Sequence, residues 1–296
     1  MNCDTTTQQI TLNYQELKDM ALQIRRDTIR MISFRGSGHP GGALGIADIL
    51  AALYGYSMDH APDRLNDPHR DRLVLSNGHI CAAWYSVLSL QGYIPREELS
   101  THRAINSRLQ GHPARDKLPL LVETSSGPLG QGLSVANGLA LAKRLDGHSG
   151  RVYCIVGDGE MQEGIIWEAL LTSSHFKLAN LTLIVAFNNL QIDGEVAKIK
   201  NLEPLAEKLS SFGWKVIDIN GHDFDQIVQA FEAAKGEKNQ PAVIIARTIM
   251  GKGIPFMEND PKWHGACPSP EEAKKALEYL GYASNYSDFP VPEEAE

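Results

Sequence analysis

Two segments decide the fold, VYCIVGDG at residues 152–159 and LTLIVAFNN at residues 181–189. Each is an apolar, β-branched run that ends in small polar residues, which is typical of a strand buried on both faces of a parallel sheet. Residues 165–175, between them, have helical periodicity. The pattern therefore predicts one strand–helix–strand unit, with Asp158 and Asn188 at the ends of neighbouring strands.

The alternation of helices and strands continues on both sides of this unit. The expected order is helix 133–145 upstream and, downstream, helix 202–212, strand 214–219, helix 224–234 and strand 242–246. Such alternation predicts an α/β fold, a doubly wound parallel sheet with helices on both faces.

The N-terminal part reads as helices joined by glycine-rich loops. Helices are expected at 14–32, 46–56 and 80–90, with a short apolar run at 73–75 and long functional loops over 92–130. A helix at 271–280 closes the fold. We therefore expect one domain over 1–282 and an acidic tail over 283–296, of which the part from 287 onward is loose.

Composition excludes several classes of protein. The 296 residues are 43% hydrophobic and 22% charged, with a formal net charge of −8 and scattered basic residues, which argues against a nucleic-acid partner. The four cysteines form no C-x-x-C pair, which indicates a reduced, cytoplasmic compartment. The N-terminus has no signal-peptide pattern and no long apolar run occurs, so we expect no membrane partner.

A dinucleotide-binding motif is matched but disfavoured. GSGHPG at residues 36–41 fits G-x-G-x-x-G, with Asp59 as the downstream acid. A true fingerprint follows a strand, whereas this one follows the helix expected at 14–32. A P-loop is also disfavoured, because G-x-x-x-x-G-K-[ST] does not occur.

The residues after the two deciding strands suit a metal and a diphosphate. Mg²⁺ prefers hard oxygen ligands and shares its sphere with phosphates, so the Asp158 carboxylate, the Asn188 amide and a backbone carbonyl would suffice. Gly157 and Gly159 allow backbone amides to approach a diphosphate, and the helix beginning near Ile165 adds its dipole. Taken singly, each motif is better explained as an ordinary turn or loop. Their joint position on successive strand ends reverses that preference.

The chain resembles the thiamine-diphosphate enzymes, and transketolase most of all. The likeness spans about residues 14–282 and runs in family order. Its motifs are GHPGG at 38–42, SNGH at 76–79, GHP at 111–113, GPLGQG at 127–132, GDGEMQEG at 157–164, NNLQIDG at 188–194 and WHG at 263–265. Any one of these motifs would be weak, but the series is specific.

The resemblance implies a set of site residues. Metal ligands would be Asp158, Asn188 and the Leu190 carbonyl, with Mg²⁺ as the ion and Ca²⁺ or Mn²⁺ able to substitute. Residues implied near the cofactor are His79, Gly127, Pro128, Leu129, Gly159, Glu163, Lys252 and His264. His39 and His112 match substrate-channel histidines, and His264 would serve both substrate and diphosphate. Lys252 also reads as an exposed loop lysine, and Glu163 as a helix N-terminal charge.

By the same resemblance, the chain is the diphosphate-binding half of a two-subunit transketolase. With a partner subunit that carries the pyrimidine-binding domain, two copies of each, it would transfer a two-carbon ketol unit between sugar phosphates. Three alternatives stay open: the α subunit of a 2-oxo acid dehydrogenase, a deoxyxylulose-phosphate synthase relative, and a non-catalytic paralogue. GHPGG and WHG favour transketolase over the two other enzymes.

Overall fold

The computed structural model describes residues 13–291. Cys3 and the last five residues of the acidic tail lie outside this range. The helices are α1 (Tyr14–Arg35), α2 (Pro40–Gly45), α3 (Ala47–Ala52), α4 (Cys81–Leu90), α5 (Gln131–Leu145), α6 (Gly164–His175), α7 (Val196–Ile199), α8 (Leu205–Ser211), α9 (Phe224–Gly236) and α10 (Pro270–Leu280). The strands are β1 (Arg72–Leu75), β2 (Val152–Gly157), β3 (Leu181–Phe187), β4 (Leu190–Gln191), β5 (Gly194–Glu195), β6 (Lys215–Asn220) and β7 (Ala242–Arg247).

The predicted parallel sheet is confirmed. Five strands pair in the order β1-β2-β3-β7-β6, all parallel, and the expected strands at 152–156, 181–187, 214–219 and 242–246 differ from the observed ones by at most one residue at either end. The apolar run at 73–75 forms β1 at one edge. β4 and β5 form a small antiparallel hairpin directly after β3.

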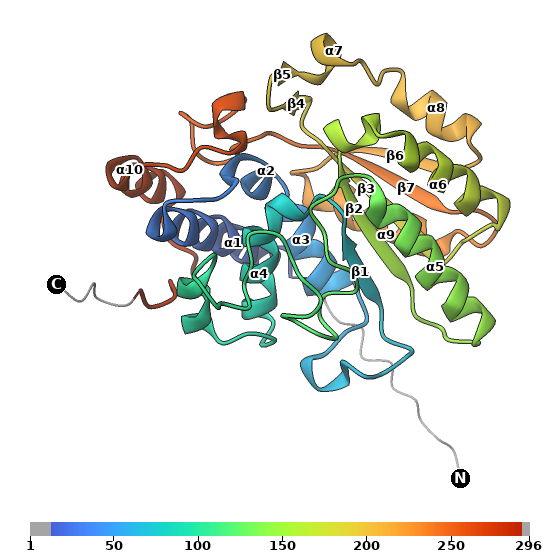
Figure 1. Ribbon diagram of the computed structural model, residues 1–296, viewed down its shortest axis with the longest axis horizontal. Helices are drawn as coiled ribbons and strands as arrows, with labels where there is room; N and C mark the ends of the chain where they lie inside the picture. Colours follow the sequence, from blue (N-terminus) through green and yellow to red (C-terminus); the bar gives the residue numbers. More distant parts are fainter. Residues whose placement is uncertain (1–12, 292–296) are drawn as a thin grey trace.

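Helices cover both faces of the sheet, as the apolar strands require. Along β2, Tyr153 and Ile155 belong to one core, while Val152, Cys154 and Val156 belong to the other. The first core is shared with α1, α3, α4 and α9, and the second with α5, α6 and α8. Figure 1 shows α5, α6 and α8 on one side of the sheet and α1, α3 and α4 on the other.

The glycine-rich segment after α1 differs from its expectation. The glycines read as a loop before a helix at 46–56, but residues 40–45 form α2, and the later helix divides into α3 and a π-helical turn, Leu53–Ser57. Pro40 opens α2 with a backbone angle suited to a helix start. A Cβ on Gly41 would lie 2.8 Å from the Trp263 carbonyl, so glycine here permits close packing.

The helix expected at 202–212 is shorter, because Pro204 disfavours a helical conformation at the residue before it. Pro204 becomes the N-cap residue, and α8 begins at Leu205. Leu202 is still buried in the second core.

The prediction of a loose end from residue 287 is wrong for the part that the structure describes. Phe289 is 1% exposed and packs in the first core. Asp288 is paired with Arg26 at 2.6 Å, and Arg96 donates to the Ser287 carbonyl at 2.8 Å. The burial of Phe289, the Arg26–Asp288 ion pair and the hydrogen bond from Arg96 hold this segment in place beside α1.

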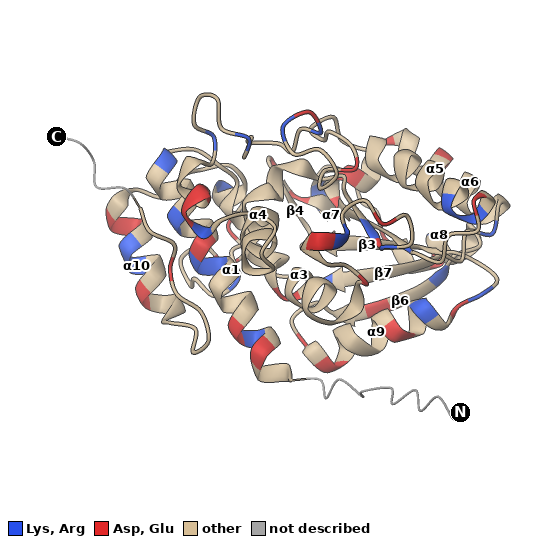
Figure 2. Cartoon of the chain, turned by 90° about the horizontal axis from the view of Figure 1, so that it is seen from below, with Lys and Arg blue, Asp and Glu red and all other residues tan. Residues whose placement is uncertain are grey.

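Basic and acidic residues are interspersed in the described part of the chain. Figure 2 shows Lys and Arg interspersed with Asp and Glu and no continuous basic face in that view. None of the helices in residues 13–291 has the length and apolar character needed to cross a bilayer.

Candidate cofactor and metal site

The ends of β2 and β3 lie side by side at one edge of the sheet. Gly157 pairs with Ala186 in the parallel register, so the residues that follow, Asp158 and Asn188, are brought together as predicted. This edge is the one at which doubly wound sheets bind their ligands, because loops diverge there and leave a crevice.

Asp158 is held in a backbone cradle. It is 3% exposed, and its two oxygens accept the N–H groups of Gly159 at 2.8 Å and Asn189 at 2.5 Å. Burial raises the pKa of Asp158 to about 6 despite these hydrogen bonds. The Asn188 amide oxygen accepts the Leu190 N–H at 2.8 Å. A buried carboxylate whose charge is penalised in this way is a favourable place for a cation.

A cavity of about 250 Å³ opens over these strand ends. Eight of the predicted site residues line it: His79, Leu129, Asp158, Gly159, Glu163, Asn188, Leu190 and His264. Glu163 is the N-cap residue of α6 and makes no side-chain capping bond. Asn77, also in the lining, has a buried Oδ1 with no hydrogen-bond partner among the described residues.

Four of the predicted histidines gather beside this cavity. The ring centroid of His39 lies 5.4 Å from His79, 5.9 Å from His112 and 5.7 Å from His264. The His79 and His264 centroids are 5.1 Å apart. These side chains come from four segments far apart in the sequence, so only the fold makes them a cluster.

Burial lowers the pKa of all four histidines and so favours their neutral form at physiological pH. Burial lowers the pKa of His39 to about 4 and that of His79 to about 3, and the neighbouring histidines add to the effect. Burial also lowers the pKa of His112 and of His264. A neutral imidazole carries one donor and one acceptor, so the cluster can exchange hydrogen bonds with hydroxyl or carbonyl oxygens.

Three further predicted residues belong neither to the cavity lining nor to the histidine cluster. Gly127 has a φ of 145° and faces the His112 ring, and Pro128 follows it. Lys252 places its ammonium 3.6 Å from a Glu258 carboxylate oxygen.

Sequence reasoning assigned no role to Glu160, although it belongs to the GDGEMQEG motif. Glu160 is 2% exposed. It accepts the Gly130 N–H at 2.7 Å, the Gly157 N–H at 3.2 Å and the Ser76 hydroxyl. The sequence did contain a signal for this role, namely an acidic residue within a motif that is expected to bind a diphosphate. A carboxylate in such a place is unfavourable unless neighbouring groups stabilise it.

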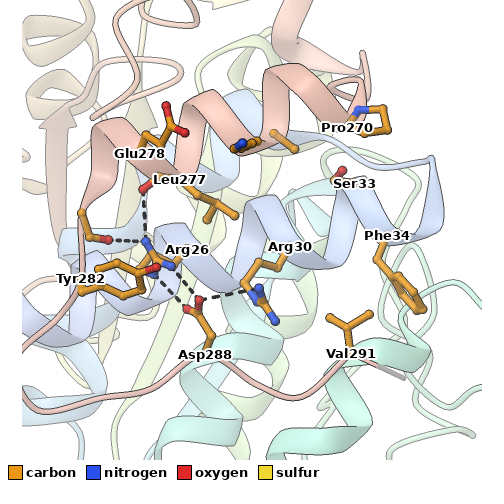
Figure 3. Close-up of a pocket in the computed structure, with 13 residues that line it drawn as sticks. Arg26, Arg30, Ser33, Phe34, Pro270, Leu277, Glu278, Tyr282, Asp288 and Val291 are labelled. Carbon is orange, nitrogen blue, oxygen red and sulfur yellow. Dashed lines mark hydrogen bonds and ion pairs between the residues drawn. The ribbon is translucent and has the colours of Figure 1, made fainter. Parts of the chain in front are cut away.

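A larger groove of about 530 Å³ runs between α1, α10 and the C-terminal segment. Figure 3 shows its floor, where Arg26 and Arg30 point at Asp288. Arg26 also donates to the Leu277 and Gly281 carbonyls. The Arg26 guanidinium and the Asp288 carboxylate are therefore occupied by internal pairing.

Comparison with known families shows which family the chain belongs to. The family model of the transketolase thiamine diphosphate binding domain matches residues 17–296. The chain belongs to the transketolase family.

Its relatives in this family are of two lengths. A 6-deoxy-6-sulfo-D-fructose transketolase subunit from Clostridium sp. is 41% identical over 273 residues, which is 92% of this chain and 97% of that protein. An apulose-4-phosphate transketolase subunit from Actinobacillus succinogenes is 38% identical, with 91% and 97% covered. The Campylobacter jejuni transketolase structure superposes with a TM-score of 0.87 at 39% identity, over 95% of this chain but 45% of that one.

The residues of the cavity fit the group that this family binds. In residues 13–291 no three His, Cys, Asp or Glu side chains are placed to hold a metal by themselves. One buried carboxylate, one amide and one turn carbonyl are instead hard oxygen donors that leave room for phosphate oxygens on the same ion. A Cβ on Gly159 would lie 3.5 Å from the Gln191 Cβ, so glycine keeps this wall of the cavity open.

Proposed function

We propose that this chain is the diphosphate- and metal-binding subunit of a two-subunit transketolase. With its partner it transfers a two-carbon ketol unit from a ketose phosphate to an aldose phosphate. The observation that carries the proposal is the cavity that joins the Asp158–Asn188 strand ends to the histidine cluster. Membership of the transketolase family and the relatives of similar length, which are themselves transketolase subunits, support it.

The strand ends would hold the cofactor through a cation. Asp158, Asn188 and the Leu190 carbonyl are the proposed ligands of Mg²⁺, for which Ca²⁺ or Mn²⁺ could substitute. When bound, thiamine diphosphate supplies the electron sink for breaking and forming the carbon–carbon bond. The proposed diphosphate contacts are His79, Gly159 and His264. Gly127, Pro128 and Leu129 would contact the thiamine.

The remaining predicted residues receive roles at the mouth of the cavity. His39, His112 and His264, as neutral imidazoles, would donate to and accept from the oxygens of the sugar. Glu163 and Lys252 are proposed for the boundary with the partner, because the Glu163 side chain makes no capping bond and the Lys252 ammonium has a long, 3.6 Å contact with Glu258.

The partner is proposed to carry the pyrimidine-binding domain, including the carboxylate that activates the cofactor. This chain covers 94–97% of the apulose-4-phosphate transketolase subunits, which supports a division between two polypeptides. Two copies of each chain would assemble around two cofactors. We place the cofactor domain in residues 1–282 and the assembly in the cytoplasm, where free thiols such as Cys81 and Cys154 persist.

Reconstitution tests this proposal. The purified chain alone, given thiamine diphosphate and Mg²⁺, should show no ketol transfer between xylulose 5-phosphate and ribose 5-phosphate. Adding its cognate partner should restore transfer, because a missing general acid or base typically lowers a rate by about 10²–10⁴-fold.

The controls separate the roles of the two chains from loss of folding. An Asp158→Ala chain should associate with the partner but bind thiamine diphosphate with sharply lower affinity in calorimetry, whereas the partner alone should be inactive. Turnover by this chain alone, at the rate of the mixture, would contradict a division of the catalytic groups between two polypeptides.

A further inference from the structure

Arg103 stands inside the histidine cluster and was given no role by the motifs. It lies in the loop that leads to His112, with a backbone φ of 61°, in the left-handed region. Its N–H donates to the Leu109 carbonyl at 2.9 Å, which holds the turn. A residue with a Cβ atom is strained in this conformation, and strained residues are often found at functional sites.

The guanidinium of Arg103 has only neutral partners among the described residues. It donates to the Ser37 hydroxyl at 2.7 Å, to His39 Nδ1 at 3.4 Å and to the Gly111 carbonyl at 3.4 Å. Its Nε is buried with no hydrogen-bond partner. By contrast, Arg25 is paired with a carboxylate. A partly buried cation without a counter-charge is unfavourable and therefore requires another explanation.

Gly111, which packs against Arg103, leaves room for the Arg103 side chain. A Cβ on Gly111 would lie 2.7 Å from Arg103 Nε. Any other residue at 111 would displace the guanidinium from the position beside His39.

The contact with His39 favours one position for the proton on that ring. A guanidinium has five N–H donors and no acceptor, so a hydrogen bond to the Nδ1 atom that faces it at 3.4 Å requires a lone pair on Nδ1. In a neutral imidazole the proton is then on Nε2. We propose that Arg103 is a positioning residue that keeps His39 in the neutral Nε2–H form, so that His39 donates a hydrogen bond to a substrate oxygen. The substrate part of this inference rests on the proposed function.

The electrostatic surroundings of His39 agree with this assignment. Burial is the main cause of its low pKa, and unfavourable electrostatic interactions of the protonated ring with His264, Arg103 and His112 lower that pKa further. His79 also lies beside the ring, with the two ring centroids 5.4 Å apart. None of these four groups is acidic, so none of them opposes the lowering of the His39 pKa.

Imidazole nitrogen NMR tests the tautomer without any activity. In the full chain labelled with ¹⁵N-histidine, and with the His39 signals assigned through His39→Asn, the wild type should show the Nε2–H form at neutral pH. Arg103→Met should give a mixture of tautomers and a His39 pKa raised by about one unit. Arg103→Lys, which keeps the charge, should stay closer to wild type.

The matched variants share the strained backbone, because each retains a Cβ at residue 103. Wild-type His39 protonated on Nδ1 would overturn the inference. A tautomer and pKa that Arg103→Met leaves unchanged would overturn it too.

A double-mutant cycle tests the consequence for catalysis in the reconstituted assembly. Arg103→Met should lower kcat/KM for the ketose by about tenfold or more, shift the acidic limb of its pH profile upward and leave the KM for thiamine diphosphate unchanged. In a His39→Ala background the same change should cause no further loss. Equal losses in both backgrounds would show that Arg103 acts independently of His39.

Failure of the proposed function and failure of the inference about Arg103 would give different results. An assembly of wild-type chains with no ketol transfer would refute the proposed function, while the nitrogen spectra would still decide what Arg103 does to His39.

Discussion

At the residue scale, the carboxylate of Glu160 ties together the three loops that form the cavity. Its acceptor bonds reach Ser76 at the start of the SNGH loop, Gly130 just before α5 and Gly157 at the end of β2. Burial raises its pKa, although the hydrogen bonds it accepts lower it. A buried acid is tolerated here because its lone pairs are occupied by donors from the walls of the site.

Replacing Glu160 should therefore affect stability and cofactor binding together. Glu160→Gln places an amide N–H₂ against groups that are themselves donors, so we expect a loss of about 2 kcal/mol in the free energy of unfolding. Affinity for thiamine diphosphate with Mg²⁺ should fall about tenfold or more, because the loops lose their common anchor. Urea unfolding and calorimetry measure the two effects. Glu207→Gln, on the exposed side of α8, is the matched control and should change neither.

At the element scale, α1 is a central helix that the C-terminal segment, residues 287–291, holds in place. We call this segment the strap. α1 packs in the first core, and α10 covers its other side through a separate cluster that contains Ile29, Ala273 and Ala276. The strap then returns over α1. Burial disfavours ionised Asp288, yet hydrogen bonds from Arg26 and Gln23 hold the pKa of that carboxyl below its usual range.

The strap should contribute measurably to stability through Phe289. Phe289→Ala removes a ring that is 1% exposed, and we expect a loss of about 3 kcal/mol in the free energy of unfolding. Phe176→Ala, whose ring is 43% exposed at the end of α6, should cost far less. Chemical denaturation of the chain compares them. Similar losses for the two variants would mean that the strap does not stabilise the fold.

At the scale of the whole molecule, apolar side chains surround the mouth of the cavity. Ile192 and Leu129 belong to the cavity lining and are 72% and 41% exposed. Ile165, 38% exposed, lies against Gly130. A group of exposed apolar residues is a common feature of protein–protein contact surfaces and of ligand grooves. This agrees with the proposal that the cofactor is enclosed only when the partner docks.

A charge on this surface should weaken assembly and leave the fold intact. Ile192→Glu should raise the dissociation constant for the partner by about tenfold or more, because a carboxylate would be buried without a counter-charge. Leu145→Glu, at the 82% exposed end of α5, should leave association unchanged. Analytical ultracentrifugation of the mixed chains distinguishes them. If only Leu145→Glu impaired assembly, the docking surface would lie elsewhere.

The order of residues along the chain was enough to predict the sheet and the neighbouring strand ends at which we propose the metal site. Strands such as 152–157 are apolar on both faces, which only a parallel sheet covered by helices accommodates, and strand length and spacing then bring Asp158 and Asn188 to one edge. Local composition also marked the loops that carry His39 and His264, because glycine and proline identify turns directly.

How those loops meet could be learned only from the folded chain. The α2 helix, the roles of Glu160 and Arg103, and the packed strap at Phe289 all depend on contacts between residues far apart in the sequence. Residue type alone does not distinguish a buried, satisfied carboxylate from an exposed one, or a cation beside a histidine from one in solvent. That difference is set by which neighbours supply hydrogen bonds and exclude water, and those neighbours are chosen by the fold.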